Sequence, residues 1–155
     1  MLFRSGLALL AGIVAGLRAL TAPAAVSWAA RLIPLNLDGS WFAFMGYAWT
    51  PWIFTALALV ELVTDQLPST PSRKVPMQFG ARIVTGALCG ATLGAAGGSW
   101  IVGLVPGVIG AVIGTFGGAE VRARMATAFG NDRPAAFIED AAAIVLGLII
   151  ILALR

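Results

Sequence analysis

Long apolar runs separated by short polar segments occupy the chain from end to end. About 20 residues at 1.5 Å per residue cross the hydrocarbon core of a bilayer, so runs of this length are typical of transmembrane α-helices. The pattern predicts five spans, over about residues 5–32, 50–65, 79–97, 101–121 and 134–154. We therefore expect an all-α integral membrane protein, a bundle of about five transmembrane helices that forms one domain over residues 1–155.

Polar and aromatic segments connect these spans. Residues 34–52 hold several tryptophans together with Tyr47, a density that marks the headgroup level of a bilayer. Residues 66–78 are the most polar part of the chain, and the three prolines there predict a loop rather than a helix. A Gly-Ser-Trp turn joins the third and fourth spans. Residues 122–133 predict a second polar loop, and Pro134 suits the first turn of the last helix.

Glycines recur at four-residue spacing through the third and fourth predicted spans, at Gly86, Gly90, Gly94, Gly98, Gly103, Gly107, Gly110, Gly114 and Gly118. Such spacing gives a helix a smooth face that another helix can approach closely, so we expect a glycine-rich helical hairpin in preference to a glycine-lined pore. A face left free by this hairpin would suit a second copy of the chain, which predicts a homo-oligomer. Cys89 lies in the same run, and we interpret it as a small packing residue.

A weak internal repeat is also present. Residues 12–16 resemble residues 82–86, and each segment is followed by a Ser-Trp pair. A duplication would relate two two-span units by an axis along the membrane normal, an arrangement found in transporters. Sequences rich in glycine and alanine also produce such matches by chance, and both interpretations stay open.

The composition supports the membrane class and removes several kinds of chemistry. Hydrophobic residues make up 59% of the chain and charged residues 11%, whereas a soluble domain would be about one quarter charged. Histidine is absent and Cys89 is the only cysteine, which excludes an intrachain disulfide and removes the commonest general base and zinc ligand. No G-x-S-x-G, H-E-x-x-H or P-loop pattern occurs, so the sequence does not favour an enzyme.

Basic residues beside the spans predict an orientation. The net charge of +3 and the pI near 10 do not indicate nucleic acid, because these residues flank apolar runs as a topology signal does. With five spans and a cytoplasmic N-terminus, the cytoplasmic side holds Arg4, Arg73, Lys74, Arg82, Arg122, Arg124 and Arg133. Only Arg31 and Arg155 fall outside, so the positive-inside rule predicts an N-terminus inside and a C-terminus outside.

Arg18 lies near the middle of the first predicted span, where a charge costs at least about 2.5–3.5 kcal/mol on insertion. It also interrupts the apolar run, so we interpret the segment as a span and not as a cleaved signal peptide. Pro23 frees the carbonyl of Ala19, and the segment around Thr21 therefore predicts a broken or kinked helix that lines a cavity. The alternative is a structural arginine tied to a buried carboxylate. We expect Arg18 to face a polar cavity without contacting Asp65, which lies too far along straight helices for the side chain to reach.

Carboxylates near the cytoplasmic ends of the second and fifth spans complete a candidate site. Glu61 and Asp65 stand four apart on one helical face, and Glu139 and Asp140 occupy the second turn of the last span. Three interpretations compete: a path or site for an ion, proton or solute, a salt-bridge network that fixes packing, and a hard-metal site of Mg²⁺ or Ca²⁺ type. The candidate site comprises Arg18, Glu61, Asp65, Glu139 and Asp140, supported by Thr21, Pro23, Pro68, Arg73 and Arg82.

Three stretches resemble a known family. They are Gly-Leu-Arg-Ala at residues 16–19, Glu-Leu-Val-Thr-Asp-Gln-Leu-Pro at residues 61–68, and the segment from Arg82 into the glycine-rich hairpin. Over about residues 6–125 the chain resembles an uncharacterised bacterial membrane family, number 4126 in the domain-of-unknown-function series. The resemblance implies a small polytopic protein of the bacterial inner membrane and implies no known activity. It draws attention to Arg18, Glu61, Asp65 and Pro68.

The buried charges lead us to expect a small channel or transporter for an ion or small polar solute. A structural or accessory membrane protein that binds a partner or lipid is the alternative, and a lipid-modifying enzyme comes third. The expected partners are the lipid bilayer and a second copy of the chain, with no cofactor outside the hard-metal interpretation. A water-accessible cavity at Arg18 would favour transport, whereas a dry and fully paired arginine would favour the accessory role.

Overall fold

The computed structural model of the protein describes residues 2–33, 35, 37, 41–64, 76–130 and 132–154. Every regular element in these ranges is helical: α1 (Leu2–Leu17), α2 (Thr21–Leu32), the 3-10 helix η1 (Trp41–Gly46), α3 (Thr50–Thr64), α4 (Pro76–Ala96), α5 (Trp100–Phe129) and α6 (Asp132–Leu154). Three segments are long and apolar enough to cross a membrane, Gln78–Ala96, Trp100–Phe129 and Pro134–Leu154. The all-helical prediction is confirmed, and these three helices support the membrane class.

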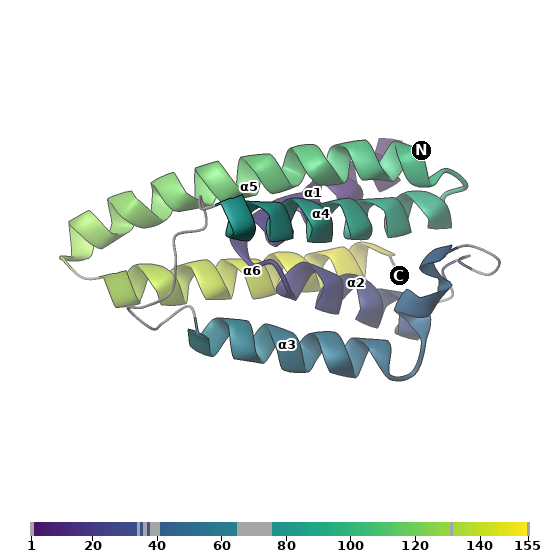
Figure 1. The fold of residues 1–155 in the computed structure, drawn as a ribbon, viewed down its shortest axis with the longest axis horizontal. Coiled ribbons are helices and arrows are strands. Elements are labelled where there is room, and N and C mark those ends of the chain that lie inside the picture. Colours follow the sequence, from purple (N-terminus) through teal and green to yellow (C-terminus); the bar gives the residue numbers. More distant parts are fainter. Residues whose placement is uncertain are drawn as a thin grey trace.

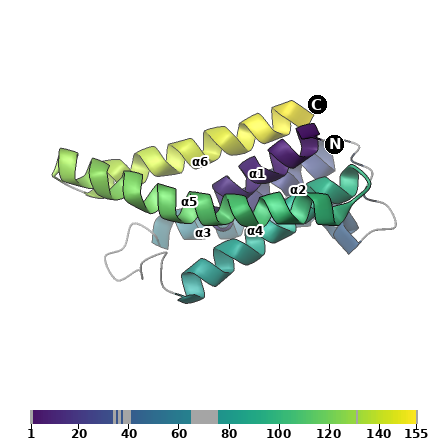
Figure 2. The same ribbon diagram turned by 90° about the horizontal axis from the view of Figure 1, so that it is seen from above.

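The α-helices run in alternating directions along one axis of the molecule (Figure 1). The start of α1 and the end of α6 lie at the same end of the bundle, and the end of α5 and the start of α6 lie at the opposite end (Figure 2). This arrangement differs from the expectation that the two termini lie on opposite sides of the membrane, and the orientation stays a prediction. That expectation depended on an odd number of crossings, and the first predicted span supplies two antiparallel helices instead of one.

The break in this first span lies between α1 and α2, at residues 18–20. From there α2 turns back toward the end at which α1 begins (Figure 1). At 1.5 Å per residue α1 is about 24 Å long and α2 about 18 Å, so each is shorter than the hydrocarbon core of about 30 Å. Pro23 explains the break, because it would clash with the carbonyl of Ala19 in a continuous helix but is tolerated in the first turn of α2.

Two further boundaries differ from the sequence pattern. Helix α4 begins at Pro76, inside the segment for which we expect a loop, because proline suits the first helical position, where no N–H bond is lost. Helix α5 continues to Phe129, through most of the second predicted loop, since residues 122–129 contain neither glycine nor proline. Gly130, with a left-handed backbone (φ 69°), ends it.

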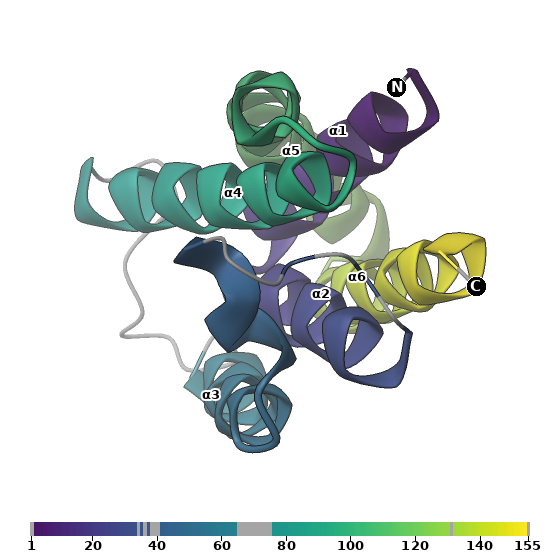
Figure 3. The same ribbon diagram turned by 90° about the vertical axis from the view of Figure 1, so that its right-hand side faces the viewer.

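The helices form two groups, seen from the end that holds both termini (Figure 3). Helices α1, α4 and α5 lie on one side, and α2, α3 and α6 lie on the other. The chain passes from the first group to the second at the α1–α2 break. This position makes the break a joint between the two groups.

Close glycine contacts hold α5 against its two neighbours in the first group. The contacts join α5 to α4 through Gly86, Gly90, Gly103 and Gly107, and α5 to α1 through Gly12, Gly16, Gly110 and Gly114. A Cβ atom added at any of these positions would lie within 3.0 Å of an atom of the facing helix, so no larger residue fits without moving a helix. We call these eight residues the glycine seam. The seam is satisfied within one chain, and the homo-oligomer stays a prediction.

The two segments of the weak repeat, residues 12–16 in α1 and residues 82–86 in α4, lie in antiparallel helices (Figure 1). An axis along the membrane normal relates helices that point the same way. A repeat of that kind is therefore wrong for these segments.

Tryptophan contacts join α2 to α3. The indole N–H of Trp28 donates to the hydroxyl of Thr55 at 2.8 Å, and its ring meets Trp52 edge-on with centroids 5.1 Å apart. At the same end the hydroxyl of Ser27 donates to the carbonyl of Met45 at 2.6 Å. These contacts fix α3 alongside α2 and bring the far end of α3 to the break.

The interior combines many alanines with a few larger apolar residues, and large apolar residues also cover the outside. The core cluster consists of Leu7, Ala11, Val14, Ala15, Ala22, Val26, Met45, Cys89, Leu93, Ala143 and Ile150. Cys89 is free and fully buried, as its interpretation as a packing residue requires. Leu59 and Val63 in α3 and Leu148 and Leu152 in α6 each expose more than half of their surface. An apolar surface of this kind is typical of helices that contact lipid or another protein.

Candidate functional site

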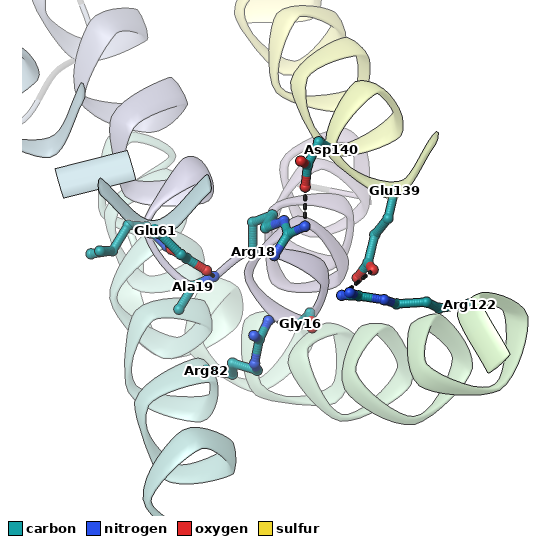
Figure 4. Close-up of polar contacts among 9 residues, drawn as sticks. Gly16, Arg18, Ala19, Glu61, Arg82, Arg122, Glu139 and Asp140 are labelled. Atoms are coloured by element: carbon teal, nitrogen blue, oxygen red, sulfur yellow. Dashed lines mark hydrogen bonds and ion pairs between the residues drawn. The ribbon is translucent and has the colours of Figure 1, made fainter. Parts of the chain in front are cut away.

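The α1–α2 break leaves backbone polar groups without helical partners inside the bundle, where each group needs a bond. Glu61, in the last turn of α3, bonds two of them (Figure 4). Its Oε1 accepts the N–H of Ala19 at 2.8 Å, and its Oε2 accepts the N–H of Leu20 at 2.7 Å. The carboxylate therefore caps the N-terminus of α2 from another helix and places negative charge at the positive end of that helix dipole.

The other side of the break, the C-terminal end of α1, is bonded by Arg82 of α4. Its Nη1 donates to the carbonyl oxygen of Gly16 at 2.8 Å, and the residue is only 3% exposed. A cation at this position complements the negative end of the α1 dipole. Arg82, which we expect to support the site from the cytoplasmic side, is thus buried within the bundle in the second turn of α4.

Arg18 lies at the break itself and is fully buried (0% exposed). Its Nη2 forms an ion pair with Oδ1 of Asp140 in α6, a residue that is 9% exposed (Figure 4). The expectation that Arg18 faces a polar cavity is therefore wrong. Because α2 turns back, it lies beside α6, where Ala25 approaches Gly147, and α6 brings Asp140 to Arg18.

We call Arg18, Glu61, Arg82 and Asp140 the break cluster. It combines two guanidinium groups with two carboxylates, so their formal charges balance. A buried charge without a partner is costly, and a balanced set of charges is tolerated far better. An ion from solution can therefore enter this cluster favourably only when one of its own charges moves away.

A second ion pair lies next to the break cluster, between α5 and α6. Nη1 of Arg122 and Oε2 of Glu139 are 3.3 Å apart, and Glu139 is 5% exposed. A cavity of about 350 Å³ between α1, α5 and α6 is lined by this pair and otherwise mostly by apolar residues, among them Leu17 and Ile138. Leu17, the residue before Arg18 in the sequence, therefore borders this mainly apolar cavity.

The remaining predicted site residues fall into two sets. Thr21 begins α2, and Pro23 is buried in its first turn. Asp65, Pro68 and Arg73 lie outside the described residues. In the part of the chain that the structure describes, no three histidine, cysteine, aspartate or glutamate residues gather as a metal-binding group. The hard-metal interpretation therefore finds no support there.

Three roles in the site were not predicted from the sequence: Glu61 as the cap of α2, Arg82 as the donor to the end of α1, and Asp140 as the partner of Arg18. The break itself had a local signal in Arg18 and Pro23. The residues that bond the break had no such local signal, because their identity depends on which helices lie beside it.

Comparison with protein-family models, curated protein sequences and solved structures gives no match to this chain. The resemblance to an uncharacterised bacterial membrane family therefore stays a prediction from the three stretches that carry it.

Proposed function

We propose that the protein is a small channel or transporter for an ion or small polar solute, with the break cluster as its polar site. The observation that carries this proposal is a helix break inside the bundle whose backbone groups are bonded by Glu61 and Arg82 from other helices. Discontinuous helices form the solute and ion sites of many transporters, because their ends offer N–H and C=O groups at membrane depth. Ionised residues at that depth are retained mainly where they function.

An anionic or zwitterionic solute fits this site better than a bare cation. The N–H groups of Ala19 and Leu20 stand at the positive end of α2, and Glu61 occupies them as a tethered carboxylate. A solute carboxylate or an inorganic anion has the same acceptor chemistry and would take this place when Glu61 moves. Arg18 and Arg82 would then balance the charge of the bound anion. In this proposal the structure represents a closed state.

A second candidate is an accessory membrane protein that binds a partner or lipid. It is favoured by one observation: Arg18 is fully buried and ion-paired with Asp140, as a structural tie between helices would be. In that role the break cluster fixes the packing of α2 against α6. The wild-type protein would then carry no solute across a membrane.

Flux measurements on proteoliposomes distinguish the two functions. We expect the wild-type protein to carry at least one of three probes: chloride, sulfate or glutamate. The double variant Arg18→Leu/Asp140→Leu should stay folded, because a buried ion pair can be replaced by apolar residues at little cost, but it should lose the flux. Arg124→Gln, which opens the exposed pair with Glu120, is the matched control and should keep it.

Two results would contradict the proposal that solute passes through the break cluster. One is a wild-type protein that carries none of the three probes. The other is a folded double variant with wild-type flux, which would show that solute passes elsewhere. The first result favours the accessory role.

We further propose that the protein lies in the inner membrane with both termini outside. Arg122 and Arg124 lie near the α5–α6 end of the bundle, which the positive-inside rule assigns to the cytoplasm. Single cysteines in a Cys89→Ala background test this orientation. An impermeant maleimide should label Phe3→Cys in intact cells and Thr127→Cys only after permeabilisation. The reverse labelling pattern would invert the orientation.

A further inference from the structure

A small polar pocket lies at the end of the bundle that holds both termini, away from the break cluster. It has a volume of about 110 Å³, well above the roughly 10–15 Å³ that one water molecule needs. Its lining includes Arg4 and Ser5 from the first turns of α1, and Ser99 and Val102 from the start of α5. Gly97, in the turn between α4 and α5, is exposed beside it, so the pocket opens at the surface.

Arg4 contributes a guanidinium group to this pocket. Its stem lies over Gly97, where an added Cβ atom would come within 2.7 Å of the Cδ of Arg4. Arg4 as a whole is half-buried, but its Nη1 atom is buried and has no hydrogen-bond partner among the described residues. A buried cationic donor without a partner is costly, so an acceptor at this point would stabilise the arrangement.

The backbone around the pocket also favours a negative charge. Helices α1 and α5 are parallel, so the positive ends of both helix dipoles lie at this end of the bundle (Figure 1). Ser99 is the N-cap residue of α5, but its hydroxyl makes no capping hydrogen bond to the first turn. The nearby end of α4 is satisfied internally, since the carbonyl of Gly94 accepts the N–H of Gly97 at 2.9 Å and of Ser99 at 3.0 Å.

We propose that this pocket binds an oxyanion of the phosphate class. The oxyanion accepts hydrogen bonds from Nη1 of Arg4, from the first N–H groups of α5 and from the hydroxyls of Ser5 and Ser99. The same chemistry is offered by the headgroup phosphate of an anionic lipid and by free phosphate. The site is separate from the break cluster, so a test of this proposal does not depend on the transport proposal.

Thermal unfolding of the detergent-solubilised chain tests the pocket with defined probes. Dioctanoylphosphatidylglycerol should raise the melting temperature in a saturable way, while dioctanoylglycerol, which lacks the phosphate, should not. Sodium phosphate is compared with sodium chloride at equal ionic strength. A saturable shift with phosphatidylglycerol alone assigns the site to lipid headgroups, and a shift with sodium phosphate as well assigns it to both sources.

Three variants tie the shift to the pocket. Arg4→Gln should raise the half-saturating probe concentration roughly tenfold or more, because it removes a charged hydrogen-bond donor. Arg31→Gln removes the same charge from an exposed position near the same end of the bundle and should leave the shift unchanged. Ser99→Asp places a tethered carboxylate at the N-cap of α5, which should support folding and abolish the response to the probe.

Any of three outcomes would overturn the proposal. The first is an equal shift of the melting temperature by dioctanoylglycerol and dioctanoylphosphatidylglycerol, because the proposal requires the phosphate group. Equal weakening by Arg4→Gln and Arg31→Gln, which would indicate a general charge effect, is the second. The third is a Ser99→Asp variant whose melting temperature the probe raises as much as that of the wild type. This variant also tests the proposal if Arg4→Gln does not fold.

Discussion

The glycine seam contains no charged side chain, whereas the break cluster, at the C-terminal end of α1, consists of four. At the seam the backbones of α1, α4 and α5 approach each other directly, and van der Waals contact holds them. At the cluster, ionised side chains from α3, α4 and α6 contact the chain segment around the α1–α2 break. The two regions meet at Gly16, which packs against α5 and accepts the hydrogen bond of Arg82.

This difference separates a fixed part of the bundle from a part that can rearrange. A seam of backbone contacts has one good register, because sliding a helix by one residue replaces a glycine with a side chain that does not fit. Carboxylate and guanidinium groups can exchange partners by rotating their side chains while the helices stay in place. We therefore expect mutations in the seam to affect stability, and mutations in the cluster to separate stability from function.

The largest effect is expected from breaking the buried pair on one side. Asp140→Leu leaves Arg18 buried without this counter-charge, which should lower the free energy of unfolding by about 3–5 kcal/mol. Thermal unfolding in detergent measures the loss. Adding Arg18→Leu should recover most of it, since the second buried charge is then gone. If the double variant has the same free energy of unfolding as Asp140→Leu, then Asp140 does not act through its ion pair with Arg18.

Widening the seam should cost about 1–3 kcal/mol. In Gly90→Leu the new side chain would meet the backbone of Gly103 and Gly107, so α4 and α5 must separate. The matched control in the same helix is Gly80→Leu, because nothing lies within 4 Å of a Cβ atom at Gly80. Unchanged melting of Gly90→Leu would show that the seam tolerates side chains and that α4 is mobile.

Removing the cap of α2 should have a smaller effect, about 0.5–2 kcal/mol. Glu61→Ala leaves the N–H groups of Ala19 and Leu20 without the carboxylate, and their hydrogen exchange should accelerate. Glu61→Gln keeps one carbonyl acceptor and should retain part of the protection. Equal exchange in the wild type and in Glu61→Ala would show that the carboxylate does not hold this end of α2.

The smallest effect is expected at the exposed pair of Arg124 and Glu120, whose side chains are 79% and 61% exposed. Arg124→Gln should change the free energy of unfolding by about 0.3–0.5 kcal/mol, because water screens the pair. The same thermal unfolding assay measures it, and the effect should disappear in high salt. A loss as large as that of Asp140→Leu would show that burial does not distinguish the two pairs.

The sequence by itself determined the helical class and most of the helix positions. The apolar runs predict both ends of α3 and of α6 to within two residues, because both are mainly apolar stretches bounded by proline or polar residues. It also determined that the first span is interrupted, since Arg18 is costly in lipid and Pro23 cannot continue a helix. These are local properties of the chain, and local physics suffices for them.

Only the tertiary structure decided where the chain goes after the break and which groups meet Arg18. The break determines where α1 ends, but the direction of α2 depends on how it packs against α3 and α6. The same holds for the glycines of α5, which repeat at the same four-residue spacing but contact different helices. Gly103 and Gly107 contact α4, and Gly110 and Gly114 contact α1. Helix spacing specifies a surface, whereas its partner is selected by non-local packing of the whole bundle. For that reason the sequence identified Arg18 as a buried charge, and only the fold paired it with Asp140.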